Sequence, residues 1–303
     1  MSETSINTLG SSGLSELQVR PVAGALGAEV SGIRLSGDLD PQIFAELKAV
    51  LHKHKVIFIR GQVHLNDQEQ EKFASLFGTP VPHPTVPSAD GTSAILSIDS
   101  QRGNRADSWH SDVTFVPNYP KVTVLRGVVV PPVGGDTVWA NTTLAYETLP
   151  VPLKIFADNL RAIHSNAYDY AVSHRVASSP EALEYRKIFT ATQFETEHPV
   201  VRVHPVTGER TLLLGHFVKK FVGLSQRDSR TILEFFQNHI TNVDNTVRWQ
   251  WKVGDVAIWD NQATQHRAIN DFGEEPRLLR RSTIEGEVPV GVDGFVSTVA
   301  AAE

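Results

Sequence analysis

The residues that could do chemistry gather in two short segments that lie far apart in the chain. The first is W-H-S-D-V-T-F at residues 109–115, and the second is W-D-N-Q-A-T-Q-H-R-A-I-N-D at 259–271. Together they offer the imidazoles of His110 and His266 and the carboxylate of Asp112. The first segment is predicted to be a strand, because tryptophan, valine, threonine and phenylalanine favour pleated structure. In a strand His110 and Asp112 point to the same side, so both could reach a single ion.

This donor set has a specific chemistry. Two histidines and one carboxylate on one face of an octahedron, with the other positions open, form the ligand set of non-haem iron(II) oxygenases. We expect His266 to be the third ligand beside His110 and Asp112. The competing interpretation is structural. A chain with 12 histidines and 34 acidic residues contains about one H-x-[DE] triplet by chance, and a lone histidine on an apolar strand more often packs in the core.

Two arginines follow His266 in the segment R-L-L-R-R-S-T-I, which is predicted to be a strand. Arg277 and Arg281 then share one face with Leu279, whereas Arg280 faces the other way. A buried guanidinium is costly unless it meets an anion, and its planar fork matches carboxylates and other oxyanions. Two inward arginines therefore indicate two anionic groups, such as an acidic cosubstrate and an acidic substrate. The alternative is a basic edge strand in solvent, which fits Arg280 better than its neighbours.

In combination these residues resemble the taurine dioxygenase family of iron(II)- and 2-oxoglutarate-dependent dioxygenases, over about residues 17–292. The resemblance implies that His110, Asp112 and His266 bind Fe2+ and that O2 is consumed. It also implies a mainly β fold with added helices, a double-stranded β-helix or cupin-like jelly roll. Members of the family are often dimers or tetramers, so a homo-oligomer is expected.

The resemblance also assigns the two arginines and a threonine. Thr137, in G-G-D-T-V-W-A-N, and Arg277 are implied to hold the distal carboxylate of 2-oxoglutarate. Arg281 is implied to meet the acidic head of the substrate and also to touch the cosubstrate.

Two positions depart from the pattern of members that act on taurine, which carry His-Pro-x-Tyr-Pro and an asparagine shortly before H-x-D. This chain keeps the histidine as His83 but has Val86 in place of the tyrosine and Ala106 at the asparagine position. A pocket that keeps His83 and Arg281 as an anion clamp and is apolar elsewhere, with Val113 lining it, favours an apolar tail over an ammonium group. The plainer interpretation is that Val86 and Ala106 are ordinary loop residues and that His83 is structural.

These departures, together with G-E-V-P-V-G-V-D-G at 286–294, are most similar to the alkylsulfatase branch of the family. Its members hydroxylate the carbon that bears a sulfate ester and release an aldehyde and inorganic sulfate. A taurine or other sulfonate dioxygenase that releases sulfite is the next interpretation, and a carboxylate substrate is the third. Outside this class stand a metal-binding cupin without oxygenase activity and a zinc hydrolase, but neither gives a role to Thr137, Arg277 and Arg281.

Composition agrees with one globular domain. The hydrophobic content of 41% is enough for a sizeable core, and the net charge of −6 argues against a nucleic-acid surface. There are no cysteines, so disulfides and thiolate metal sites are excluded. Because the N-terminal sequence does not resemble a signal peptide and no apolar run reaches membrane-spanning length, we expect a cytoplasmic protein without membrane partners and with a small anionic substrate. We predict a disordered tail at 1–16, one domain at 17–292 with a lid at about 164–198, and a C-terminal tail at 293–303.

Local signals also place the elements that must position these residues. Helices are expected after Asp40-Pro41, Asn66 and Ser225, each of which offers a helix cap. A hairpin is expected around Gly208. The other histidine pairs, His52/His54 and His198/His204, are assigned to helix faces and loops because no third partner lies near them in the sequence. Strands are predicted at 17–35, 55–60, 122–130, 136–139, 200–206, 210–214, 246–251, 256–259 and 277–284.

Overall fold

The protein is seen here in a computed structural model that describes residues 17–102, 106–167 and 180–300. Its largest element is an eight-stranded sheet, which is antiparallel except where β2 meets β3. The strand order is β1 (Gln18–Pro21), β2 (Ala28–Ser31), β3 (Val56–Ile59), β14 (Val256–Asp260), β6 (Val122–Val129), β16 (Leu278–Ile284) and β4 (Pro80–Val81), with β5 (Ile95–Asp99) also paired to β16.

Two helices cover one face of this sheet. The first is α1 (Pro41–His54) and the second is α2 (Asp67–Ala74), and their apolar side chains form one core cluster with β3, β6, β14 and β16. Both begin where the sequence predicts. The Asp40 side chain accepts hydrogen bonds from the first amides of α1, and Asn66 forms a complete capping box with Glu69 at the start of α2.

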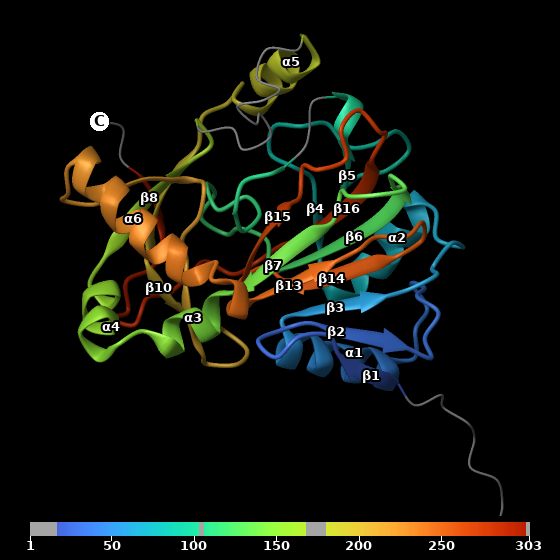
Figure 1. Ribbon diagram of the computed structural model, residues 1–303, viewed down its shortest axis with the longest axis horizontal. Coiled ribbons are helices and arrows are strands. Elements are labelled where there is room, and N and C mark those ends of the chain that lie inside the picture. The colour runs from blue at the N-terminus through green and yellow to red at the C-terminus, as the bar shows by residue number, and fades with distance from the viewer. Residues whose placement is uncertain (1–16, 103–105, 168–179, 301–303) are drawn as a thin grey trace, which may run out of the picture.

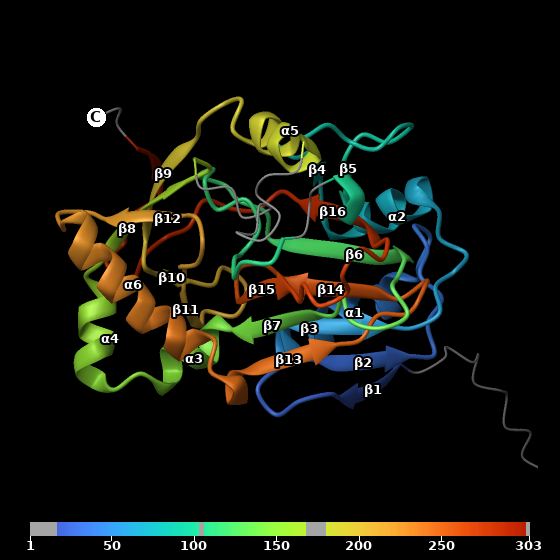
Figure 2. The ribbon, with the colours of Figure 1, turned by 45° about the horizontal axis from the view of Figure 1, so that its top comes forward.

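A three-stranded sheet of β13 (Thr246–Trp249), β7 (Thr137–Asn141) and β15 (Thr264–Ala268) faces the other side (Figure 2). The core between the two layers is aromatic, and Trp139 and Trp259 contact each other within it. Strand alternation decides this packing, because Val256 and Ile258 of β14 face the helices whereas Trp259 faces inward. The arrangement is the predicted jelly roll.

Much of the rest of the described chain packs at one end of the jelly roll (Figure 1). A four-stranded sheet has the order β12 (Val218–Phe221), β8 (Arg161–Ser165), β9 (Glu195–Pro199) and β17 (Thr298–Val299). The predicted hairpin is confirmed as β10 (Val201–Val203) and β11 (Arg210–Leu212), with Gly208 at a φ of 72° in its turn. The helices are α3 (Thr142–Thr148), α4 (Val151–Asp158), α5 (Pro180–Phe189) and α6 (Gln226–Ile240), and single turns of 3-10 helix span Ser75–Phe77, Ser100–Arg102 and Val243–Asn245.

Two predicted boundaries differ from the structure. The described parts of the predicted lid at about 164–198 include α5 and the paired ends of β8 and β9, so they are not irregular throughout. The residues after 292, predicted as a tail, contribute β17 and the buried Ser297 to the fold. Residues 168–179 of the lid and the tail at 1–16 lie outside the described residues. No helix in the described ranges is long and apolar enough to cross a membrane.

Candidate active site

The two segments singled out in the sequence meet at one point inside the jelly roll. His110, Asp112 and His266 are buried, and each offers a ligand atom within 4.8 Å of the other two. Nε2 of His110 lies 3.7 Å from Oδ1 of Asp112, and Nε2 of His266 lies 3.9 Å from the same oxygen. The structure therefore brings together the predicted triad from residues that are remote in the chain.

The local structure of the first segment differs from the prediction. His110 forms an isolated antiparallel bridge with His266 of β15, in which each amide donates to the carbonyl of the other residue. The chain then leaves the sheet in a turn, with Val113 at a φ of 58°. The predicted strand over 109–115 is wrong, because this left-handed backbone cannot continue a pleated strand. Asp112 therefore lies at the start of a turn and not within a strand.

Hydrogen bonding fixes which ring nitrogen of His110 can bind a metal. Nδ1 of His110 lies 2.7 Å from the carbonyl oxygen of Ser108 and donates its proton there, because a carbonyl can only accept. In the neutral form of the ring the lone pair is on Nε2, which faces the Asp112 carboxylate. A carbonyl partner on the remote nitrogen is the usual arrangement of metal-binding histidines. A lone pair and a carboxylate that face each other suit a cation between them.

The other two members have the protonation states that a metal requires. Burial and the nearby His110 lower the pKa of His266 well below its usual value, so its imidazole is neutral. The ring of His266 packs against Trp259, with centroids 4.6 Å apart. Burial raises the pKa of Asp112, but the Arg281 guanidinium and both histidines outweigh it and hold that pKa well below its usual value. The Asp112 carboxylate is ionised, contacts Arg281 and accepts a hydrogen bond of 2.9 Å from the hydroxyl of Thr123.

Arg277 and Thr137 form a second group of donors. Nε of Arg277 donates to the carbonyl oxygen of Gly135 at 2.8 Å, and another guanidinium nitrogen donates to Oγ1 of Thr137 at 3.2 Å. That hydroxyl oxygen also accepts from Nε1 of Trp251 at 2.9 Å, so its own proton is directed elsewhere. Burial lowers the pKa of Arg277 to about 10, partly opposed by Asp136. Within the part of the chain that the structure describes, no carboxylate forms an ion pair with Arg277, so the site fits an added acidic ligand.

His83 is a neutral hydrogen-bond donor beside Arg281. Its Nδ1 accepts from the amides of Thr85 at 3.3 Å and Val86 at 3.1 Å, so Nε2 carries the proton. That Nε2 is buried and has no hydrogen-bond partner among the described residues. Burial, reinforced by the Arg281 guanidinium, lowers the pKa of His83 to about 3. A buried N–H donor without an acceptor fits the predicted contact with an anion.

An apolar cluster adjoins His83. The rings of Phe115 and Phe189 lie 6.2 and 5.4 Å from the His83 ring, measured between centroids. Phe217 and the predicted Val113 belong to the same cluster. The cluster also contains Tyr185, and Val86 and Ala106 pack against it. We call the cluster and these two packed residues the apolar wall. Sequence reasoning missed its aromatic members, because single phenylalanines scattered over remote segments carry no local signal.

A cavity of about 830 Å3 lies next to this wall, between α5 and the outer edge of the large sheet. Val86 and Tyr185 line it, but none of the predicted metal, cosubstrate or substrate residues does. Leu278 and Arg280 line it from the side of β16 that faces away from Arg281. The cavity therefore adjoins the site and does not contain the triad.

Comparison with known proteins agrees with this geometry. Residues 18–283 match the family described as "Taurine catabolism dioxygenase TauD, TfdA family". The chain belongs to this family. It is 59% identical over 283 residues to an "Alpha-ketoglutarate-dependent sulfate ester dioxygenase" of Pseudomonas putida, a match that covers 93% of this chain and 94% of the relative. It is 56% identical over 281 residues to an "Alkylsulfatase" of Acinetobacter baylyi, covering 92% and 88%.

The fold is shared as well. A crystal structure described as a putative alpha-ketoglutarate-dependent taurine dioxygenase from Burkholderia xenovorans superposes with a TM-score of 0.81 at 36% identity. The match covers 95% of this chain and 99% of that one. The predictions of a jelly-roll fold and of a dioxygenase of this family are confirmed.

Proposed function

We propose that this dioxygenase uses iron(II) and 2-oxoglutarate to oxidise alkyl sulfate esters, releasing an aldehyde and inorganic sulfate. The observation that carries the substrate class is the contact between an anion clamp and an apolar surface. The buried Nε2–H of His83 and the guanidinium of Arg281 suit a sulfate group, and the apolar wall beside them suits an alkyl chain. The names of the Pseudomonas putida and Acinetobacter baylyi relatives support the same class.

The roles of the remaining residues follow from their contacts. His110, Asp112 and His266 would hold Fe2+, which leaves the other coordination positions to 2-oxoglutarate and O2. Arg277 and the hydroxyl proton of Thr137 would bind the distal carboxylate of 2-oxoglutarate. A guanidinium has five N–H donors, so Arg281 can contact Asp112 and also meet an anion. When bound, iron and 2-oxoglutarate would together activate O2, which is the oxidant: 2-oxoglutarate supplies two electrons as it is converted to succinate and CO2, and one oxygen atom replaces a C–H bond of the substrate by C–OH.

The protein's own contribution is orientation and leaving-group stabilisation. With the sulfate held by His83 and Arg281, only the adjacent carbon is presented to the metal. The hydroxylated carbon then carries both an OH group and the sulfate ester oxygen. Loss of the hydroxyl proton forms the aldehyde C=O bond as the C–O bond to sulfate breaks, and the departing anion stays paired with the same donors. No hydrolytic water is required.

The proposal is tested by turnover with Fe2+, ascorbate and 2-oxoglutarate, with and without O2, using a medium-chain alkyl sulfate and taurine in parallel. Succinate and sulfate formed from the alkyl sulfate only when O2 is present would support oxidative ester cleavage. Sulfite from taurine would move the enzyme to the sulfonate class. Sulfate formed without O2 or succinate would mean hydrolysis and would exclude the oxygenase. The homo-oligomeric state, the cytoplasmic location and the lid stay predictions.

A further inference from the structure

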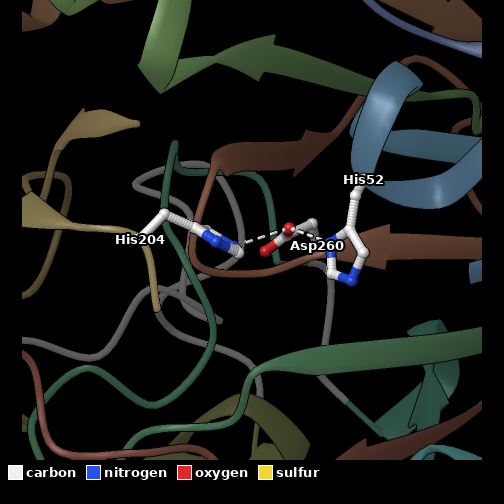
Figure 3. A group of neighbouring side chains, drawn as sticks. All are labelled: His52, His204 and Asp260. Carbon is white, nitrogen blue, oxygen red and sulfur yellow. Dashed lines mark hydrogen bonds and ion pairs between the residues drawn. The ribbon is translucent and has the colours of Figure 1, made fainter. Parts of the chain in front are cut away.

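The end of β14 and the turn that leads to β15 hold two buried residues, Asp260 and Asn261, to which no role in metal or substrate binding falls. Asp260 lies between two histidines that the sequence did not bring together (Figure 3). Its Oδ2 is 3.2 Å from Nδ1 of His52, which belongs to α1, and 2.9 Å from Nε2 of His204, which follows β10. The expectation that His52 and His204 have no third partner is therefore wrong.

The tautomer of His204 decides that this second triad is a hydrogen-bonded group and not a metal centre. Nδ1 of His204 accepts from the amides of Val206 at 3.2 Å and Thr207 at 3.1 Å. The proton of the neutral ring must then lie on Nε2, where it is donated to Asp260. A metal would need the lone pair on that nitrogen. His110 has the opposite arrangement, because its Nδ1 donates to a carbonyl and its Nε2 keeps the lone pair.

Asn261 links the same turn to the candidate metal centre. Its Oδ1 accepts from the amide of Asp112 at 2.7 Å, and its Nδ2 donates to the carbonyl of Asp112 at 3.1 Å and to that of Pro120 at 2.8 Å. One side chain thus binds both backbone groups of Asp112. Only a carboxamide offers an acceptor and two donors in this geometry. An aspartate here would place a carboxylate oxygen against two carbonyl oxygens.

The position of the Asp112 carboxylate depends on this clamp. Asp112 lies in a turn whose next residue, Val113, has a left-handed φ that a β-branched residue adopts only under constraint. Asn261 holds both backbone groups of Asp112 immediately before this residue, and Asp260, the neighbour of Asn261 in the chain, bonds to α1 and to the segment after β10. Trp259, the preceding residue, packs on His266. Trp259 and Asn261, on either side of Asp260, therefore contact the ligands His266 and Asp112.

We propose that Asn261 is a positioning residue for the metal ligand Asp112, and that the His52–Asp260–His204 group fixes the turn from which Asn261 acts. The inference rests on the proposed function, because it assumes that Asp112 binds the metal. The W-D-N part of the second segment thus positions a metal ligand and does not itself bind the metal.

The test is an anaerobic titration of metal-free protein with Co2+, followed by visible absorption, together with thermal unfolding in a chelator. Asn261→Asp should lower the Co2+ affinity roughly 10- to 100-fold, the usual effect of losing a group that orients a ligand, and should change the Co2+ spectrum. Asp260→Asn acts one step further away and leaves Asn261 in place. It should therefore lower the Co2+ affinity by a factor several times smaller than Asn261→Asp does.

The matched control is Asn245→Asp. Asn245 is also a buried asparagine, and its Nδ2 donates to the carbonyls of Asn141 at 2.9 Å and Ile240 at 2.7 Å, away from the metal centre. It should lower the unfolding temperature as Asn261→Asp does, with the Co2+ affinity unchanged. An equal loss of Co2+ affinity in the control would overturn this inference, and so would an unchanged affinity in both Asn261→Asp and Asp260→Asn. Neither result would overturn the proposed function.

Further outcomes of the titration test the assignment of the second triad and the proposed function separately. Binding of a single Co2+ per chain supports the hydrogen-bonded assignment of the second triad. A second bound Co2+ that disappears in His204→Gln would make it a metal site and overturn its assignment as an anchor. A wild-type chain that binds neither Co2+ nor Fe2+ would overturn the proposed function, and this inference with it.

Discussion

Replacement of Arg277 by methionine tests the cosubstrate site without a large effect on folding. Two charge-assisted hydrogen bonds to a carboxylate are worth about 3–4 kcal/mol together, which corresponds to a roughly 150- to 900-fold loss of 2-oxoglutarate affinity. Stability should change little. Burial lowers the pKa of Arg277 from its usual value to about 10, so the buried charge costs about 3 kcal/mol at neutral pH. Its removal offsets the loss of the two hydrogen bonds to Gly135 and Thr137, at about 1 kcal/mol each.

The assay is calorimetric titration of 2-oxoglutarate into protein loaded anaerobically with Co2+, paired with thermal unfolding of the metal-free protein. Arg280→Met is the control, because Arg280 faces away from the site and pairs with Asp67 at 2.9 Å. It should leave the affinity for 2-oxoglutarate unchanged. A loss below fivefold in Arg277→Met, or an equal loss in Arg280→Met, would refute the assignment of Arg277. An unfolding temperature that drops by more than about 10 °C would refute the stability argument.

Three further outcomes follow from other parts of the structure. His83→Phe removes the buried N–H donor, so KM for an alkyl sulfate should rise about tenfold or more with unchanged 2-oxoglutarate affinity; unchanged KM would remove His83 from the substrate site. The double variant Val86→Tyr with Ala106→Asn should shift the ratio of kcat/KM from alkyl sulfate toward taurine, and an unaltered ratio would show that these positions do not select the substrate. Burial lowers the pKa of His198 to about 3, so only the unfolded chain binds this proton between about pH 3 and 6.5, and stability falls as the pH falls. His198→Asn should therefore make the pH dependence of the unfolding free energy shallower by about 1.4 kcal/mol per pH unit in that range. Urea denaturation at a series of pH values measures this free energy, and an equal pH dependence in variant and wild type would contradict the prediction.

The sequence by itself determined the features that depend on near neighbours. The caps at Asp40 and Asn66 and the turn at Gly208 are set by side chains and backbone angles within a few residues, so local chemistry was sufficient. The alternation of β16 likewise separates the buried Arg281 from Arg280, and Arg277, which directly precedes the strand, is buried as well. The residue types of the candidate metal triad could also be proposed from the sequence, because few chemistries use two histidines, a carboxylate and two arginines together.

Tertiary structure alone decided how those residues meet. The turn at Asp112 depends on hydrogen bonds from Asn261 and Thr123, which come from other strands or turns and leave no periodic trace in the sequence. The tautomers that distinguish the two histidine–aspartate groups depend on whether a carbonyl or an amide faces Nδ1, and folding sets that choice. His52, His204 and Asp260 became partners for the same reason. Local propensities act over a few residues, whereas these contacts form between segments that only the packing of the sheets brings together.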